Sequence, residues 1–434
     1  MSVAAFAERP AQPDVAAQHD PLPRASRKGI GLCLSGGGFR ASLFHLGALR
    51  RLNELGILAR KDFRTITSVS GGSITAAALA TALAKRGSGP DGPIPNEAWD
   101  REVRDPLRVF TKKDVRTGPF LKRFLPWKVW KTETTVEALA ARYEKELTPL
   151  RLRELPERPE FLFLATDMAY GVSFGFARDW MGDYQAGYMS PPEDFPVGKA
   201  VAASACFPPL FGPLRLRLDP SHLKQGCAPR GQQRDACLSD FRLTDGGDYD
   251  NMGLEPVWKS HAVVLVSDAG GLFTEESDKG LLWRIPRYQG IQERQARALR
   301  KRWLIASFCQ GTLEGTYWSV ASAPSQYEEE DRKEDRPKEE RPTFPGYSKS
   351  LAREVIAEIR TDLDAFSDAE AAVLENHGYL LADAAIRRHV PALLDEPSPA
   401  AVVPHPDWFP PTCSEDAIRT ALKDSGKRKT WGRG

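Results

Sequence analysis

Apolar positions in the first third of the chain switch between short continuous runs and helical spacing. Ile30–Leu34 is a short apolar run that stops at a glycine cluster, which favours a buried strand followed by a loop. Ala41–Leu55 carries leucines at helical spacing and predicts a helix. Phe63–Thr67 favours a second strand, and the Ala-rich run Ile74–Leu83 predicts a second helix. This alternation predicts an α/β fold with parallel strands.

The pattern continues with a hairpin and then becomes mainly helical. Phe161–Ala165 and Val172–Phe176 predict two strands joined by a turn, and Ala262–Val266 is typical of a buried parallel strand. Asp219–Asp240 is predicted to be an excursion loop. Helices are expected at Thr135–Leu147, Val197–Cys206, Ile291–Phe308, Ala352–Ile359 and Asp368–Val390.

Composition divides the chain into one large domain with two tails. Residues 1–26 lack periodicity and are expected to form a disordered tail, and residues 396–434 form a Pro-rich tail. Between them we expect a single domain, 27–395. A charged insertion lies near 327–341, where eight acidic residues stand against five basic ones.

Charge and cysteine usage indicate a globular protein of the cytoplasm. The chain has 434 residues, 41% of them hydrophobic, and a net charge of +2. We find neither a signal peptide nor an apolar run of about 18 residues that could span a membrane. The six cysteines lack C-x-x-C spacing, so reduced thiols are expected, although Cys227 and Cys237 are close enough in sequence to bridge a loop.

Ser70 lies where a predicted strand turns into a predicted helix. Its neighbours Ser68, Gly71 and Gly72 are small, as a sharp turn between a strand and a helix requires. Such a turn lifts the serine hydroxyl clear of the sheet, close to the amino end of the helix. The pattern differs from G-x-S-x-G only in its first glycine, and a simple turn that starts a helix would also produce it.

Two further segments offer what a serine nucleophile needs. The loop Gly36-Gly37-Gly38 can bring backbone N–H groups close to a substrate oxygen, and Arg40 follows it with a positive charge. The loop lacks the G-K-[ST] of a phosphate-binding loop. Asp245 precedes two glycines that allow a tight turn, and burial there would raise the basicity of its carboxylate. An ordinary flexible loop and an ordinary Asp-Gly turn remain as plain interpretations.

Taken together, these segments resemble the patatin-like phospholipase family. The resemblance rests on SGGGFR, SVSGG and DGG in that order, with AVAASACFPPLFGP before the last, and covers roughly Lys28–Gly271. It implies a three-layer α/β/α sandwich, with extra helices in the carboxy-terminal third. It also implies a lipid acyl hydrolase of the phospholipase A or lysophospholipase type, which needs no metal or cofactor.

The resemblance assigns roles to six residues of this chain. Ser70 would be the nucleophile and Asp245 the base of a Ser–Asp dyad. The oxyanion site would be formed by Gly36, Gly37, Gly38 and Arg40. Ser68 departs from the family pattern by replacing the first glycine of the turn, and the carboxy-terminal third matches no motif of the family.

Three alternatives remain open on the sequence. A Ser-His-Asp hydrolase could use Ser70, then Asp245 or Asp268, then His377 or His389, because that chain order occurs in the class. A lipid-binding module without activity would keep the same motifs. The third alternative is a nucleic-acid binder that would use the basic stretch 111–131. Separately, the acids Asp245, Asp248 and Asp250 resemble a calcium loop, but Lys259 stands where that loop needs a glutamate.

The stretch 111–131 combines seven basic residues and one acid with four aromatic residues, Phe120, Phe124, Trp127 and Trp130. This combination favours a membrane surface, where Trp prefers the interface and basic residues attract anionic lipid. Packing of the aromatic residues in the core is the plain alternative. We expect a phospholipid surface as partner and no nucleic acid, because no nucleic-acid motif accompanies the patch. A cytoplasmic location with peripheral attachment to membranes follows.

Overall fold

The computed structural model describes residues 27–87, 92–117, 133–208, 211–271, 277–328, 343–423 and 425. The amino-terminal tail, most of the charged insertion and the four aromatic residues of the basic patch lie outside these ranges. Predictions about those segments, and about the domain limits at 27 and 395, stay predictions. All six cysteines are described, and each is a free thiol.

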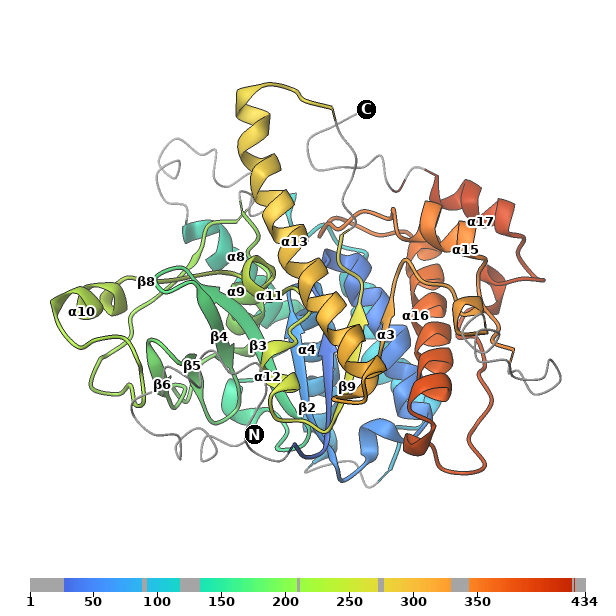
Figure 1. Cartoon of the computed structure of the whole chain (residues 1–434), viewed down its shortest axis with the longest axis horizontal. Coiled ribbons are helices and arrows are strands. Elements are labelled where there is room, and N and C mark those ends of the chain that lie inside the picture. Colours follow the sequence, from blue (N-terminus) through green and yellow to red (C-terminus); the bar gives the residue numbers. More distant parts are fainter. Residues whose placement is uncertain are drawn as a thin grey trace.

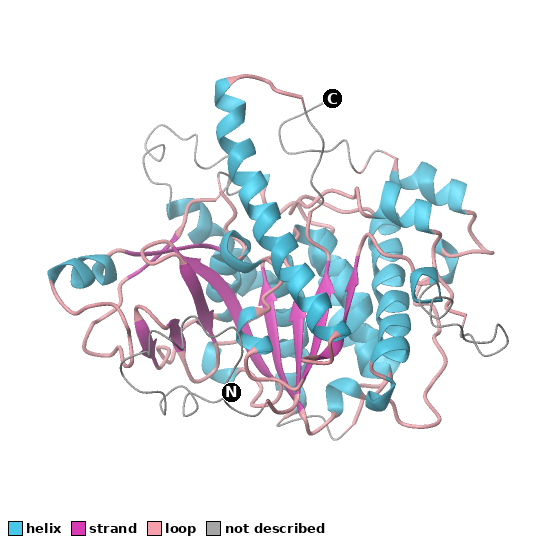
Figure 2. Ribbon diagram, in the orientation of Figure 1, coloured by secondary structure: helices cyan, strands magenta, loops and turns pink. Residues whose placement is uncertain are grey.

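A ten-stranded sheet forms the centre of the described chain (Figures 1 and 2). Strand order is β10-β9-β1-β2-β3-β4-β5-β6, with β8 pairing β3 and β7 pairing β8. The strands are β1 (Ile30–Leu34), β2 (Phe63–Val69), β3 (Glu160–Asp167), β4 (Val172–Phe176), β5 (Met181–Asp183), β6 (Gly187–Met189), β7 (Leu214–Leu216), β8 (Phe241–Asp245), β9 (Val263–Asp268) and β10 (Glu314–Ser319). The five strands from β10 to β3 run parallel, as the alternation of elements predicts.

Helices cover both faces of this sheet. The helices are α3 (Gly38–Glu54), α4 (Gly71–Arg86), α5 (Asn96–Trp99), α6 (Asp105–Thr111), α8 (Glu133–Glu146), α9 (Val197–Ser204), α10 (Gln232–Ser239), α11 (Gly247–Asp250), α12 (Glu255–Trp258), α13 (Leu281–Cys309), α15 (Lys349–Leu351), α16 (Asp368–His389) and α17 (Glu415–Leu422). In Figure 1, α12 and α13 lie in front of the sheet, while α3 and α4 lie behind it. The predicted α/β/α sandwich is confirmed.

Strand β1 shows how the sequence builds these layers. Its alternate residues Ile30, Leu32 and Leu34 point into the large core shared with the helices behind the sheet. Cys33 points the other way, into a smaller core that includes Val257 of α12 and Leu304 of α13. A short strand buried on both faces is therefore apolar almost throughout, which is why it reads as a continuous run.

The carboxy-terminal third supplies helices that pack onto the family-like part of the chain. α16 lies along α3, and both helices have a glycine where they cross: a β-carbon at Gly47 would collide with the Glu375 carbonyl, and one at Gly378 with the Phe44 carbonyl. Because neither position has room for a side chain, the two backbones come into direct contact. The extra helices expected in this third are confirmed.

Three predicted elements differ from the structure. Helix α13 begins at Leu281, three turns before the predicted start, because the break comes at Gly280 with φ 97°. The predicted loop 219–240 contains α10, whose weak apolar periodicity hides it from sequence analysis. The predicted helix Ala352–Ile359 is instead α15 followed by a π-helical turn, η5 (Ala352–Ile356).

Candidate active site

Strands β2 and β8 approach each other along the same edge of β3. Val69, the last residue of β2, pairs with Leu164, and Asp245, the last residue of β8, pairs with the next residue, Ala165. β4 occupies the opposite edge of β3 at these positions, so β8 continues the edge that β2 leaves. The register alone therefore places Ser70, which follows Val69, next to Asp245.

Ser70 has a strained backbone. Its φ of 50° and ψ of −116° lie in a region that L-residues rarely adopt, and Gln225 is the other non-glycine residue with positive φ in the described chain. The turn is held by close packing: a β-carbon at Gly71 would collide with the Gly38 carbonyl, and one at Gly72 with the Leu34 carbonyl. Ser70 itself is half-buried. A strained, accessible serine between a strand and a helix is typical of nucleophile elbows.

Asp245 is a buried carboxylate with few partners. Its Oδ1 accepts a hydrogen bond from the Gly247 N–H at 2.7 Å. Burial raises the pKa of Asp245 to about 7, and the negative charge of Asp248 adds to this effect. The nearby Ser70 hydroxyl opposes this shift in the pKa of Asp245, as expected for two side chains that the register places next to each other. A carboxylate with a pKa near neutrality can accept a proton from a hydroxyl far better than an ordinary one.

Ser204, at the end of α9, connects the turn at Ser70 to the loop that follows Asp245. Its hydroxyl accepts a hydrogen bond from the Ser70 N–H at 2.9 Å and lies 2.9 Å from the Ser73 hydroxyl. Its carbonyl accepts one from the Gly246 N–H at 3.2 Å. One buried serine thus fixes the position of the elbow relative to the aspartate loop.

Ser204 and Asn251 support the candidate site without having been predicted to do so from the sequence. The Asn251 carbonyl accepts a hydrogen bond from the Gly36 N–H at 3.0 Å, so it connects the aspartate loop to the glycine loop. The signal for Ser204 was present in AVAASACFPPLFGP, where it is the only hydroxyl residue of a small-residue helix. Asn251 acts through its backbone carbonyl, for which no sequence signal exists.

The predicted oxyanion residues fall into two groups. Gly36 lies beside the serine, since a β-carbon there would be 3.1 Å from the Ser70 β-carbon, but its N–H donates to Asn251. Gly37 and Gly38 adopt positive φ of 140° and 57° at the start of α3. Within the described residues, neither of their N–H groups donates a backbone hydrogen bond, and both stand at a helix amino end that favours negative charge.

Arg40 uses its guanidinium to hold loops together. It donates to the carbonyls of Ala269 at 2.9 Å, Ala357 at 2.6 Å and Ile359 at 2.8 Å. Its side chain is 2% exposed, and burial lowers its pKa to about 10. Arg40 thereby connects the glycine loop to the carboxy-terminal third.

The histidines considered for a triad lie elsewhere. His377 is buried on α16, where its Nε2 is 2.9 Å from the Val320 carbonyl and its ring packs against Phe44. His389 stacks on Tyr327. Asp268 is engaged by Arg297 at 2.6 Å and by the Tyr317 hydroxyl at 2.7 Å. Of the aspartates considered, Asp245 is the one that the register places next to Ser70.

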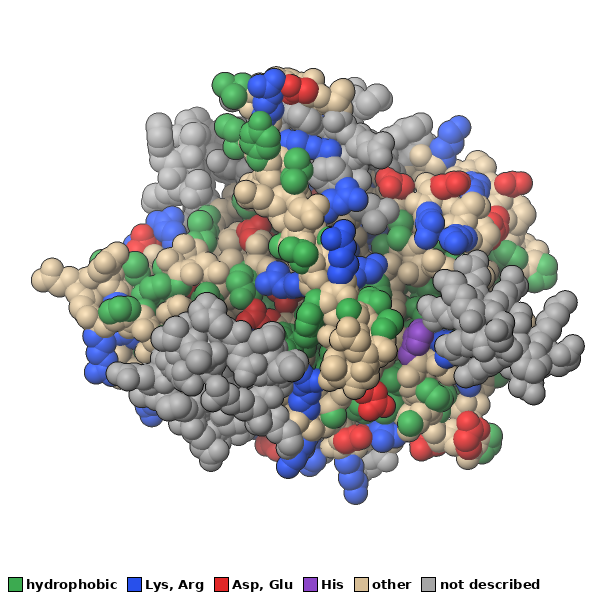
Figure 3. Space-filling model, in the orientation of Figure 1, with side chains coloured by type: hydrophobic (Ala, Val, Ile, Leu, Met, Phe, Trp, Pro, Cys, Tyr) green, Lys and Arg blue, Asp and Glu red, His purple; other side chains and the backbone are tan. Residues whose placement is uncertain are grey.

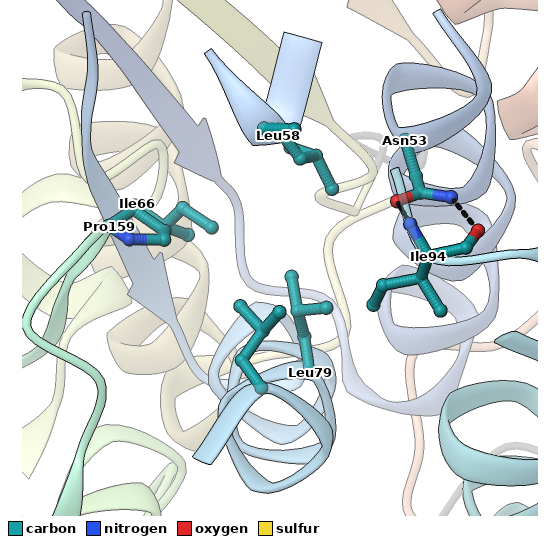
Figure 4. A pocket seen from close by; sticks show the side chains of 8 residues that line it. Asn53, Leu58, Ile66, Leu79, Ile94 and Pro159 are labelled. Carbon is teal, nitrogen blue, oxygen red and sulfur yellow. Dashed lines mark hydrogen bonds between the residues drawn. The ribbon is translucent and has the colours of Figure 1, made fainter. Parts of the chain in front are cut away.

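A small void lies away from this site. A void of about 10 Å³ lies near the start of β3, lined by residues such as Leu58, Ile66, Leu79 and Pro159 (Figure 4). Asn53 closes one side through paired hydrogen bonds to the Ile94 backbone. The void holds no more than a single water molecule and sits at the amino-terminal edge of the strands, opposite Ser70. In the described ranges no cluster of ligating side chains suits a metal ion.

Comparisons with known proteins define the family. The family model described as "Patatin-like phospholipase" matches residues 32–258, more than half of the chain. The match begins in β1 and ends in α12, so it includes Ser70, Asp245 and the glycine loop. The fold and this match together define a hydrolase of the α/β/α type. The chain belongs to the patatin-like phospholipase family, a family of lipid ester hydrolases.

Solved structures give distant likenesses. Human GIVD cytosolic phospholipase A2 is similar with a TM-score of 0.33 and 13% identity over 56% of this chain and 45% of that chain. VipD from Legionella pneumophila is similar with a TM-score of 0.24 and 16% identity over 61% of this chain and 52% of that one. The chain thus spans about half the length of these structures. A comparison with curated proteins found no match.

Proposed function

We propose that the protein hydrolyses carboxylic esters of phospholipids, as a phospholipase A or lysophospholipase, through an acyl-Ser70 intermediate with Asp245 as the base. The observation that supports this most directly is the register on β3, which puts a strained serine beside a buried aspartate. The family is the second support.

The chemistry would proceed in two balanced steps. The Ser70 oxygen attacks the ester carbonyl carbon while its proton passes to the Asp245 carboxylate. Loss of the lipid alcohol, which takes that proton, leaves an acyl-serine. Water then attacks the acyl carbon, Asp245 accepts a proton from the water and returns it to the Ser70 oxygen, and the fatty acid leaves.

The oxyanion of each step would be held by backbone N–H groups of Gly37 and Gly38. Both lie in the loop that faces the elbow, and they start α3, so the helix end adds to the local positive potential. Gly36 and Arg40 would instead fix the loop, through Asn251 and through the three carbonyls that Arg40 binds. This division refines the four-residue oxyanion site expected from the sequence.

Covalent labelling and turnover test this proposal together. Ser70→Ala should abolish labelling by a fluorophosphonate probe and turnover of a soluble short-chain ester. Asp245→Asn should lower that turnover about 10²–10⁴-fold, the usual cost of losing a general base, with the fold retained. His389→Ala, which changes an exposed histidine far from the elbow, is the matched control and should keep near-normal turnover.

Labelling that persists in Ser70→Ala would contradict the assignment. Ser35 and Ser73 would be the next candidates, although both are fully buried and engaged in hydrogen bonds. A histidine variant that is as inactive as Asp245→Asn, while folded by circular dichroism, would replace the dyad with a triad. A probe that labels no serine would favour a lipid-binding module without activity.

A further inference from the structure

We infer that the amino-terminal half of α13 is a docking surface for anionic phospholipid bilayers, an inference that rests on the proposed lipid substrate. This half stands above the rest of the described chain in Figure 1. Among the side chains described there, Leu281 is 72%, Ile285 63% and Tyr288 60% accessible to solvent. Exposed apolar groups of this size, so close together, mark an interaction site more often than an ordinary surface.

The four most exposed apolar side chains described in α13 form one stripe along the helix. Leu281, Ile285 and Tyr288 are spaced by four and three residues, and Leu299 follows five turns after Leu281. Leu299 is 60% exposed. The helix uses a different face to contact the body, where Leu304 is fully buried and Arg297 reaches Asp268. The helix therefore already packs against the body of the protein with another face, and the apolar stripe is a separate, exposed face.

Basic residues accompany the stripe. From Leu281 to Arg302 the helix has seven arginines or lysines and one acid, Glu293, in a protein whose net charge is only +2. Helical spacing places Arg284 and Arg302 beside the apolar stripe, and both are exposed. Arg284 pairs with Asp278, an exposed contact that costs little to exchange for a lipid headgroup. Figure 3 shows basic and hydrophobic side chains together along this helix.

Exposed apolar side chains next to arginines favour one kind of binding partner for α13. Apolar side chains flanked by arginines suit a layer whose headgroups are negative and whose interior is hydrocarbon, as in an anionic bilayer. A second copy of the chain is disfavoured, because pairing the same face would bring two strongly basic helices together. In the described part of the chain, no helix is both long and apolar enough to cross a bilayer, so α13 would lie on the membrane and not span it.

The surface is joined to the candidate active site through the body of α13. Arg300 donates to the carbonyl of Tyr249, four residues after Asp245, in α11. Arg297 donates at 2.7 Å to the carbonyl of Gly271, in the loop after β9. Both loops follow strand ends at the edge where Ser70 lies. A bilayer bound to α13 would therefore face the loops that surround Ser70 and Asp245.

Vesicle sedimentation tests the surface separately from catalysis. The full chain is mixed with vesicles of ether-linked phosphatidylcholine, with or without ether-linked phosphatidylglycerol, because ether lipids cannot be hydrolysed. The wild type should bind the anionic vesicles preferentially. Leu281→Gln/Ile285→Gln/Tyr288→Gln should reduce binding at least about tenfold. Arg284→Gln/Arg302→Gln should reduce it by about fivefold for each arginine removed, the scale for one basic residue near an anionic surface.

The matched control removes exposed apolar groups elsewhere. Val109→Gln/Val402→Gln changes side chains that are 57% and 72% exposed, and it should bind vesicles like the wild type. All variants should turn over a soluble short-chain ester at the wild-type rate. A wild type that does not turn over the soluble ester at all would instead count against the proposed activity.

Three results would overturn the inference. The first is a wild type that ignores anionic vesicles, and the second is an α13 variant that binds them undiminished. The third is self-association of the wild type, in size-exclusion chromatography, that the α13 variants abolish, because the stripe would then cover a second copy.

Discussion

At the scale of single residues, the candidate site depends on where one carboxylate titrates. Burial and the neighbouring Asp248 raise the pKa of Asp245 to about 7. Below that pH the carboxyl group is protonated and cannot accept the serine proton, so kcat/KM for a soluble ester should fall about tenfold per pH unit on the acid side.

Asp248→Asn changes that titration without touching the dyad. Its removal takes a negative charge away from Asp245, so the pKa of Asp245 should decrease and the acid limb should move to lower pH. The measurement is the pH profile of kcat/KM for wild type and variant. Asp235→Asn, an exposed acid on α10, is the control and should leave the profile in place. A limb that stays fixed in Asp248→Asn would mean that another group controls it.

Residue patterns in the sequence point to the candidate site residues more readily than to the hydrogen bonds that hold the surrounding loops in place. Ser70, Gly37 and Gly38 adopt positive φ, and a β-carbon at Gly246 would collide with the Leu164 carbonyl, so the turns of the candidate site need the small residues that mark them in the sequence. The partners of Arg40 could not be predicted, since they are carbonyls of Ala269, Ala357 and Ile359 that any residue would supply. Only the folded chain brings those carbonyls to one guanidinium.

At the scale of elements, one ion pair with a buried carboxylate and a partly buried arginine holds α13 against the sheet. Asp268, at the end of β9, is buried, which alone would raise its pKa, but Arg297 and the Tyr317 hydroxyl hold the pKa far below its ordinary value. A depressed carboxyl pKa contributes stability above the unfolded pKa of about 4, and this contribution is lost as the pH falls.

Arg297→Gln should therefore destabilise the protein by about 3–5 kcal/mol at neutral pH, because Asp268 would remain buried without its cation. The loss should shrink on acidification, and Arg297→Gln/Asp268→Asn should recover part of it. Denaturant unfolding at two pH values measures both effects. Arg284→Gln, which breaks the exposed pair with Asp278, is the control and should change stability by less than about 1 kcal/mol.

Sequence analysis finds elements where periodicity and a clear stop coincide. α9 and α16 begin at their predicted residues, and the β3–β4 hairpin is antiparallel as expected. β8 was not predicted, although Asp245 was, because Phe241–Asp245 alternates apolar and polar residues over too short a run. Its pairing with β3 is a long-range contact, and the position of Asp245 beside Ser70 depends on it.

At the scale of the whole molecule, the carboxy-terminal third belongs to the same folded body as the family segment. The family match ends at residue 258, yet α16 packs along α3 of that segment, and Arg40 binds carbonyls at 357 and 359. The helix that begins at the glycine loop is thus covered by residues far beyond the match. Stability of the candidate site should depend on this contact.

Gly378→Ala tests whether the candidate site depends on the contact between α16 and α3, because it adds a single carbon atom at that contact. In an isolated helix the change would stabilise by up to about 1 kcal/mol, since alanine has the higher helix propensity. Here the new β-carbon would meet the Phe44 carbonyl, so α16 must move away from α3. We expect a net loss of about 1–3 kcal/mol or more, the scale of overpacking in a core, with lower turnover of a soluble ester near the melting transition.

Gly290→Ala is the matched control, because it makes the same substitution inside helix α13 at a position with open space around it. Only the higher helix propensity of alanine should matter at this position, so the Gly290→Ala variant should be as stable as the wild type or more stable. Both variants are compared with the wild type by denaturant unfolding, followed in parallel by circular dichroism and by ester turnover. Since one body should unfold as a unit, the two probes should report one transition for each protein. A Gly378→Ala variant as stable as Gly290→Ala, or turnover that survives after the helical signal of the carboxy-terminal third is lost, would show that the family segment holds its site without α16.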